Sequence, residues 1–398
     1  MAYRKFKADQ LFTGHRLLQQ EEVLITNEKG VIEAIVPLSE AGEDVQPLDG
    51  ILCPGFVNAH CHLELSHMKG KIASGSGMVD FLLGVMKQRN FPQDEVQQAI
   101  AGAASQMWNN GIVAVGDICN TPDTIAAKSN SPLLFHNFIE TMGFIPATAP
   151  QRLAGAKAVC DQFEAAFPER NSIVPHAPYS VSPELMQLIA AIPGNRLLSL
   201  HNQESDAETQ FLKDGTGPMR RLYEFLGIDL AFYQPAGKSS PQVMLPALHP
   251  DQSMILVHDV KTTTADLQWI EAAGQWRTDA SKARPNLFFC LCPNANLYIG
   301  NGLPDIDLLR KNNLMLLIGT DSLSSNHQLS ILEEIRTIAS HYPHIPPEEL
   351  LQWATANGAV ALQMNDVIGS FEKGKKPGLV LLQNAQHGLK FATVKRLM

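Results

Sequence analysis

Five residues that can bind a metal or move protons each follow a short apolar run in this chain. His60 and His62 come after ILCPGFVNA, His201 after RLLSL, His258 after MILV, and Asp321 after LMLLIGT. A short apolar run bounded by turn residues predicts a buried parallel strand. Residues just past such strands lie at the carboxyl end of a sheet, where (β/α)8 barrels build their active sites. The set therefore predicts a mononuclear metallohydrolase.

His60 and His62 are two residues apart, so on a strand both imidazoles point the same way and Cys61 points away. Neutral imidazoles suit Zn(II) and Fe(II). His201 supplies a third nitrogen, and Asp321 completes the set while leaving a position open for water. We expect one divalent ion, zinc in preference to iron, held by His60, His62, His201 and Asp321.

Glu204 lies three residues after His201, where the chain turns into a helix. A carboxylate there is near the metal without binding it, as a proton shuttle requires; the alternative is that it stabilises the helix N-terminus. Because four ligands already complete the site, we expect His258 to hydrogen-bond the water or the substrate. Asp321 can also accept the proton of the water, although it fits a turn position as well. The expected catalytic residues are Glu204, His258 and Asp321.

Three further residues are predicted to contact substrate. His176, in VPHAPYSVS, ends another predicted strand, and a structural role is its alternative. Glu64 and His67 lie in the first loop over the site. Glu208, one helical turn past Glu204, is expected to be structural.

Apolar strands alternate with helical stretches from residue 51 to about residue 360, which is typical of an α/β barrel. The predicted helices include 94–110, 182–192 and 331–340, and the eight predicted strands are 51–59, 112–118, 133–139, 172–175, 197–200, 254–257, 286–292 and 314–320. Residues 51–363 are therefore predicted to form a (β/α)8 hydrolase barrel. Residues 1–50 and 364–398 read as strands and turns, with a hairpin turn at Lys29-Gly30. We expect these two ends to form a small β-sandwich domain.

The composition of the chain limits the classes of molecule that it is expected to bind. The 398 residues are 45% hydrophobic and 18% charged, with a net charge of -9. An acidic chain is a poor partner for nucleic acid or an anionic membrane, and we find neither a signal-like start nor an apolar run of about 20 residues. Six dispersed cysteines without a CxxC pair predict reduced, structural thiols and a cytoplasmic protein. A small-molecule substrate is expected, and a homodimer is left open.

The motifs PGFVNAHCHLELS, HAPYSVS, HNQES, LVHD, LCPNANLYIGNGLPDI and GTDSLSSN, in this order, resemble the cytosine-deaminase and triazine-hydrolase-like branch of the amidohydrolase superfamily. The resemblance implies a barrel with a small β-sandwich and the metal set His60, His62, His201 and Asp321. It also implies acid/base roles for Glu204 and His258 and a substrate contact for His176. Binuclear members of the superfamily resemble one another in a bridging lysine after strand four. IVPHAP has none, which favours one ion.

The narrower pattern HCHLELSHMKG resembles aminofutalosine deaminases, menaquinone-pathway enzymes acting on a 6-aminopurine nucleoside. That resemblance implies hydrolytic deamination, with metal hydroxide attacking the ring carbon that bears the amino group. The alternatives are a methylthioadenosine or S-adenosylhomocysteine deaminase and a triazine-type amino- or chlorohydrolase. A non-catalytic scaffold is least favoured, since no ligand is missing. A benzoate-bearing substrate would need a cation or hydrogen-bond donor at the rim of the pocket. The candidates are Lys69, Arg89, Arg220 and Arg221, with surface solvation as the favoured alternative for each.

Overall fold

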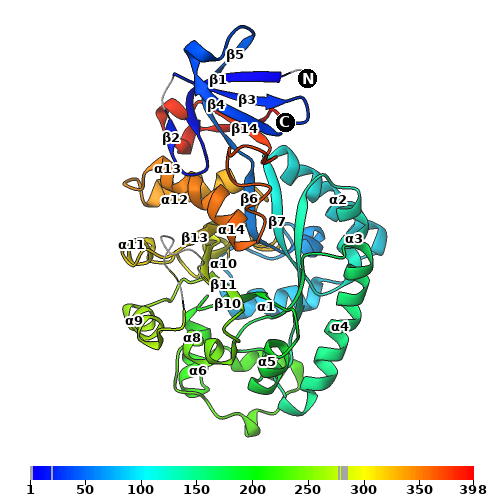
Figure 1. Cartoon of the computed structure of the whole chain (residues 1–398). Helices are drawn as coiled ribbons and strands as arrows, with labels where there is room; N and C mark the ends of the chain where they lie inside the picture. The colour runs from blue at the N-terminus through cyan, green and yellow to red at the C-terminus, as the bar shows by residue number, and fades with distance from the viewer. Residues whose placement is uncertain (1–2, 19–20, 277, 279–285) are drawn as a thin grey trace.

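The computed structural model describes residues 3–18, 21–276, 278 and 286–398. Figure 1 shows a large barrel of strands and helices with a smaller sheet at one end. The mixed α/β class is confirmed. None of the described helices is both long and apolar enough to cross a membrane. All six cysteines are free and buried, as expected of structural thiols.

Eight parallel strands make the barrel wall. They pair as two four-stranded sheets, β6–β9 and β10–β13. Backbone hydrogen bonds cross both junctions: the N–H of His201 donates to the carbonyl of His176, and those of Thr320 and Asp321 donate to the carbonyl of His60. The strands are β6 Phe56–Cys61, β7 Ile112–Cys119, β8 Leu134–Thr141, β9 Asn171–Pro175, β10 Leu197–Asn202, β11 Ser253–His258, β12 Leu287–Leu291 and β13 Leu316–Ile318.

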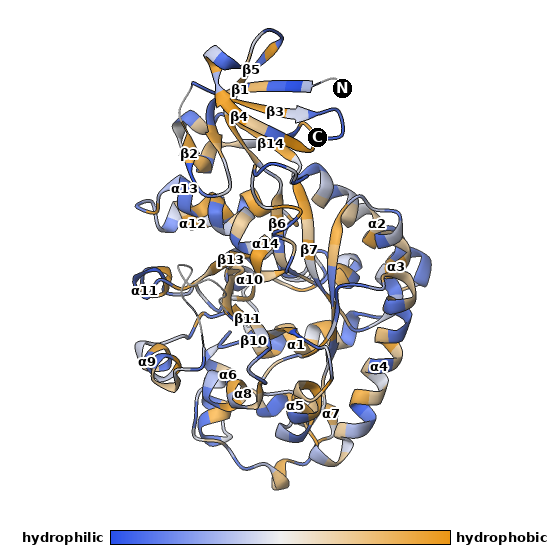
Figure 2. Ribbon diagram, viewed as in Figure 1, coloured by the Kyte–Doolittle hydropathy of each residue, from blue (hydrophilic) through white to orange (hydrophobic). Residues whose placement is uncertain are grey.

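Helices cover the outside of this wall (Figure 1). Every residue of β7 is buried, as expected of a parallel strand covered on both faces. Figure 2 shows apolar strands surrounded by helices with one apolar and one polar face. The helices are α1 Met78–Gln88, α2 Gln93–Asn109, α3 Ile125–Ser129, α4 Ala149–Ala166, α5 Pro183–Ala190, α6 Asp206–Asp214, α7 Arg220–Leu226, α8 Ser240–Met244, α9 Thr264–Ala273, α10 Pro293–Ile299, α11 Ile306–Lys311, α12 Ile331–His341, α13 Pro347–Gln352 and α14 Gly358–Ala361.

The chain ends meet in a second sheet, ordered β15-β14-β5-β1-β3-β4 with β2 paired to β1. The antiparallel pair β3 and β4 forms the hairpin expected around Gly30, whose φ is +80°. The pairings join all seven strands into one sheet, so a β-sandwich is not confirmed. The strands are β1 Tyr3–Phe12, β2 Leu17–Leu18, β3 Glu22–Asn27, β4 Ile32–Pro37, β5 Val45–Pro54, β14 Leu379–Gln383 and β15 Thr393–Arg396.

The strand expected over 51–59 is in fact two strands in different sheets. β5 ends at Pro54 in the terminal sheet, and β6 begins at Phe56 in the barrel. The change occurs at Gly55, where an added Cβ would lie 2.2 Å from Val113 Cγ1 and 2.8 Å from the carbonyl oxygen of Pro377. Both halves are buried, so hydropathy could not distinguish them. The domain division at residue 51 stays a prediction.

Candidate active site

The predicted ligands converge at the carboxyl end of the barrel. His60 and His62 come from the end of β6, His201 from β10, and Asp321 follows β13. His62 Nε2 lies 3.1 Å from His201 Nε2 and 3.4 Å from Asp321 Oδ1. His60 Nε2 lies 3.5 Å from the same Asp321 oxygen. His258, at the end of β11, joins them, since ligand atoms of His60, His201, His258 and Asp321 lie within 4.8 Å of one another.

This arrangement fits a divalent cation. His60 is completely buried, and neither ring nitrogen has a hydrogen-bond partner among the described residues. His201 Nδ1 lies 2.9 Å from the carbonyl oxygen of His176, so it carries the proton and leaves Nε2 as a lone pair. Asp321 Oδ2 accepts from Ser325 Oγ at 2.5 Å, which leaves Oδ1 for the centre. Buried acceptor atoms without a hydrogen-bond donor destabilise the folded protein unless a cation binds to them.

The charge states also suit metal binding. Burial lowers the pKa of His62 to about 4 and keeps that of His201 well below its usual value, so both are neutral near pH 7. Burial alone would raise the pKa of Asp321. The contact with His60 and the fields of His62 and His258 outweigh it and hold that pKa well below its ordinary range.

Four of the nine described non-glycine residues with positive φ lie at the same strand ends. His258 and Asp321 have φ values of +79° and +54°, and Gln203 and Asp259 also adopt positive φ. Residues other than glycine rarely occupy this left-handed region, and those that do cluster at functional sites. The surrounding structure therefore holds the loops that follow these strands in backbone conformations that are unfavourable for an isolated chain.

Glu204 lies beside His258 as a buried carboxyl group. Burial, reinforced by the charges of Asp321 and Glu208, raises the pKa of Glu204 well above its usual value. Its Oε2 lies 3.7 Å from His258 Nε2, and the side-chain amide of Asn301 donates to its Oε1 at 3.4 Å. Glu208 accepts the backbone N–H groups of Gln203 and Glu204 at 2.9 and 3.0 Å. Glu208 therefore has the structural role expected of it.

A cavity of about 570 Å³ opens above this set. Polar groups form its floor: His62, His176, His201, Glu204, His258 and Asp321. Its walls are mostly apolar and include Met78, Phe81, Val85, Met86, Phe144, Tyr223 and Leu226. The cavity therefore admits a molecule with a polar reacting end and an apolar body.

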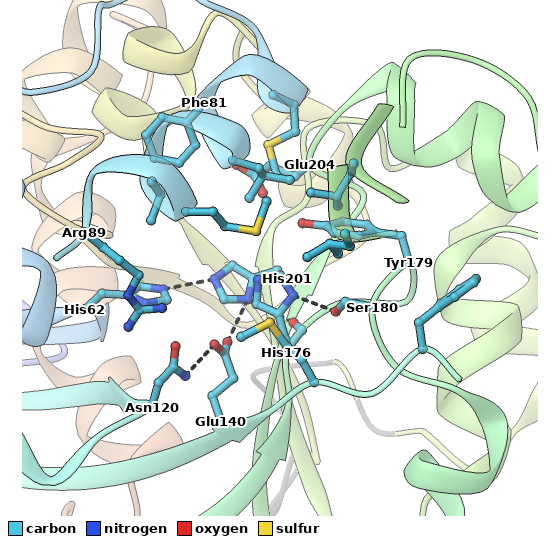
Figure 3. Close-up of a pocket in the computed structure, with 18 of the residues that line it drawn as sticks. His62, Phe81, Arg89, Asn120, Glu140, His176, Tyr179, Ser180, His201 and Glu204 are labelled. Atoms are coloured by element: carbon cyan, nitrogen blue, oxygen red, sulfur yellow. Dashed lines mark hydrogen bonds and ion pairs between the residues drawn. The ribbon is translucent and has the colours of Figure 1, made fainter. Parts of the chain in front are cut away.

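The predicted substrate contacts divide into two groups. His176 lines the cavity, with Nδ1 2.7 Å from Ser180 Oγ (Figure 3). Glu64 and His67 are not among the residues that line it. They hold Arg89, which does: Glu64 Oε1 lies 3.7 Å from the Arg89 guanidinium, and His67 Nε2 lies 3.0 Å from the Arg89 carbonyl oxygen. A direct substrate contact by Glu64 or His67 stays a prediction.

The four candidate cations differ in whether they line the cavity. Of the four, only Arg89 lines the cavity. Arg221 pairs with Asp80 at 2.6 Å on the surface, and Arg220 donates to the carbonyl of Gly215. The sequence reasoning missed Arg152, on α4, which lines the cavity and has no ion pair within the described part of the chain.

Two polar wall residues were also missed, Asn120 and Glu140. Both follow or end predicted strands, 112–118 and 133–139. Strand-end position, the signal used for the histidines, could therefore have found them.

The chain belongs to the amidohydrolase family, whose model matches residues 51–398. This confirms the predicted family and the enzyme class, a hydrolase acting on C–N bonds. Members of the family are generally metal-dependent, in agreement with the site.

Several named deaminases are similar to this chain in sequence or in fold. An adenosine deaminase of Helicobacter pylori is 27% identical over 83% of this chain and 78% of its own length. An aminodeoxyfutalosine deaminase of Nitratiruptor is 27% identical over 84% of this chain and 79% of its own. The crystal structure of Helicobacter pylori aminofutalosine deaminase with methylthio-coformycin superposes with a TM-score of 0.81 at 23% identity, covering 98% of this chain and 97% of that one.

Proposed function

We propose that this protein is a metal-dependent hydrolytic deaminase of 6-aminopurine nucleosides, with aminofutalosine as its preferred substrate. One observation carries the proposal: a buried Glu204, whose pKa is raised by burial, lies beside a convergent His/Asp set on the floor of a cavity. The names of the relatives point to the same chemistry.

His60, His62, His201 and Asp321 would hold one divalent ion, zinc in preference to iron. The ion would lower the pKa of a coordinated water so that hydroxide forms near neutral pH. We assign His258 to hydrogen bonding with the water or the substrate and not to metal binding. Its Nε2 faces Glu204, and its Nδ1 lies 2.9 Å from Asn296 Oδ1.

The remaining steps belong to the side chains. Asp321 takes the proton of the water as the water oxygen bonds to the amino-bearing carbon. Glu204 gives its proton to the adjacent ring nitrogen, and His258 stabilises the developing oxyanion. The carbon–nitrogen bond then breaks as Asp321 passes its proton to the amino group, which leaves as ammonia. The hydroxyl proton returns to Glu204 as the carbon–oxygen bond becomes a carbonyl, and the ring nitrogen keeps the proton that Glu204 gave it.

The cavity walls support the choice of substrate. Met78, Phe81 and Leu226 suit an aromatic or alkyl substituent, and Arg152 suits a carboxylate. Aminofutalosine carries both features on one nucleoside tail. Methylthioadenosine carries only an apolar tail, so it is the competing substrate that the same site could take.

A substrate panel tests the proposal. Ammonia release and the purine absorbance change are followed with adenosine, methylthioadenosine, S-adenosylhomocysteine and aminofutalosine. We expect the highest kcat/KM for aminofutalosine, and Arg152→Met should lower it for aminofutalosine but not for methylthioadenosine. No turnover of any of these purines contradicts the proposal.

A further inference from the structure

Glu140, near the end of β8, is a buried carboxylate that lines the cavity and has no part in the steps above. Its side chain is 2% exposed. Asn120 Nδ2 donates to its Oε2 at 2.9 Å, whereas Oε1 has no hydrogen-bond partner among the described residues. Its Oε1 lies 3.5 Å from His201 Nδ1, but that N–H already donates to the carbonyl of His176. An unpaired buried acceptor is costly, so Oε1 is suited to a donor brought by the ligand.

The chemistry of the ligand limits which donor this is. The inference rests on the proposed function, in which the ligand is a 6-aminopurine nucleoside. The unsubstituted ring nitrogens of the purine are hydrogen-bond acceptors. The donors of an adenosine-like nucleoside are therefore its amino group and its sugar hydroxyls. The amino group departs where Glu204 and His258 move protons, and Figure 3 shows Glu140 on the other side of His201 from Glu204. The sugar hydroxyls are the donors that remain.

We propose that Glu140, fixed by Asn120, accepts a hydrogen bond from a sugar hydroxyl and makes the site specific for ribonucleosides. The acceptor is held firmly. The backbone N–H of Asn120 donates to Glu64 Oε2 at 2.9 Å, and Glu64 in turn lies against Arg89. Carboxylates accept from ribose hydroxyls in the same way in dinucleotide-binding folds.

Glu140→Gln removes this acceptor with little change in shape. Asn120 donates to the Oε2 position, so the amide oxygen of glutamine must occupy it, and an N–H group replaces Oε1. The experiment measures kcat/KM of the metal-loaded wild type and of Glu140→Gln. The probes are the best nucleoside of the substrate panel and its 2′-deoxy and 3′-deoxy forms. Metal content and thermal midpoint are recorded for both proteins, and Glu184→Gln, exposed on α5, is the control.

In the wild type, loss of the contacted hydroxyl should lower kcat/KM by about 5-fold or more, the usual effect of a lost hydrogen bond. In Glu140→Gln, the intact nucleoside should lose a similar factor, and discrimination should shrink to within about 2-fold, because the two changes remove one interaction.

Unchanged discrimination in Glu140→Gln overturns the inference. So does loss of metal with discrimination intact, which would make Glu140 a positioning residue for His201. If the wild type has the same kcat/KM for the nucleoside and for both deoxy forms, this inference is overturned and the proposed function is not affected. Absence of any purine turnover contradicts the proposed function, and the inference falls with it.

Discussion

At the scale of residues, the site shifts the pKa values of two carboxyl groups in opposite directions within one cavity. Three histidines outweigh the effect of burial and lower the pKa of Asp321, whereas burial and the charges of Asp321 and Glu208 together raise the pKa of Glu204. Environments that separate the pKa values of neighbouring carboxyls are how a single site provides an acid and a ligand together.

Replacing the proposed acid should separate catalysis from metal binding. Glu204→Gln keeps the shape of the side chain but cannot donate the same proton, so kcat should fall about 10²-fold or more. Metal analysis should still find close to one ion per chain. Full activity in this variant would remove Glu204 from the mechanism.

His136, on β8 away from the ligand set, should make the protein sensitive to acid. Burial, with smaller effects of Arg170 and Lys128, lowers the pKa of His136 to about 3. The unfolded chain takes up this proton near pH 6.5 but the folded chain does not, so the free energy of unfolding falls as pH decreases from about 6.5 towards 3. The loss is about 1.4 kcal/mol per pH unit for this one group.

Urea unfolding at several pH values checks this effect. His136→Gln should show a shallower fall in the free energy of unfolding than the wild type. His249→Gln, an exposed histidine, should match the wild type. Parallel curves for His136→Gln and wild type would rule out the effect.

At the scale of elements, a buried ion pair ties the ligand strand to its neighbour. Asp117 on β7 accepts the backbone N–H of Leu63, the residue after His62, at 2.8 Å. Its other oxygen lies 2.6 Å from Lys128 on α3, and both side chains are fully buried. The 3₁₀ helix Leu63–Met68 that follows the HxH motif is thereby anchored to β7.

Breaking one side of this pair should be costly, because the partner charge stays buried alone. Lys128→Met should lower the free energy of unfolding by about 3–5 kcal/mol. The double variant Asp117→Asn/Lys128→Met should lose less than the sum of the two single losses. Denaturant titration of the four proteins provides the measurement, and strict additivity would show that the pair is not coupled.

At the scale of the whole molecule, Gly55 is where the terminal sheet passes directly into the barrel. The backbone of Pro377 and the side chain of Val113 leave no room there for a Cβ. This contact makes the two sheets depend on each other.

Gly55→Ala should therefore destabilise the protein by about 1–3 kcal/mol through overpacking. Gly102→Ala, in α2 where a Cβ would meet nothing within 4 Å, should instead stabilise it slightly, since alanine favours helices. Thermal unfolding of both variants measures the difference. Equal thermal midpoints for the two variants would show that the backbone around Gly55 accommodates a Cβ without loss of stability.

The sequence by itself determined the α/β class, seven of the eight barrel strands to within two residues at each end, and the placement of the candidate ligands at strand ends. These features are local, because an apolar run and the residue that follows it keep their order in any packing. Only the tertiary structure decided that Arg152 lines the cavity and that Glu64 and His67 lie behind Arg89. It also decided that one apolar run divides between two sheets. Hydropathy records whether a residue is buried, but only packing between distant segments decides what it is buried against.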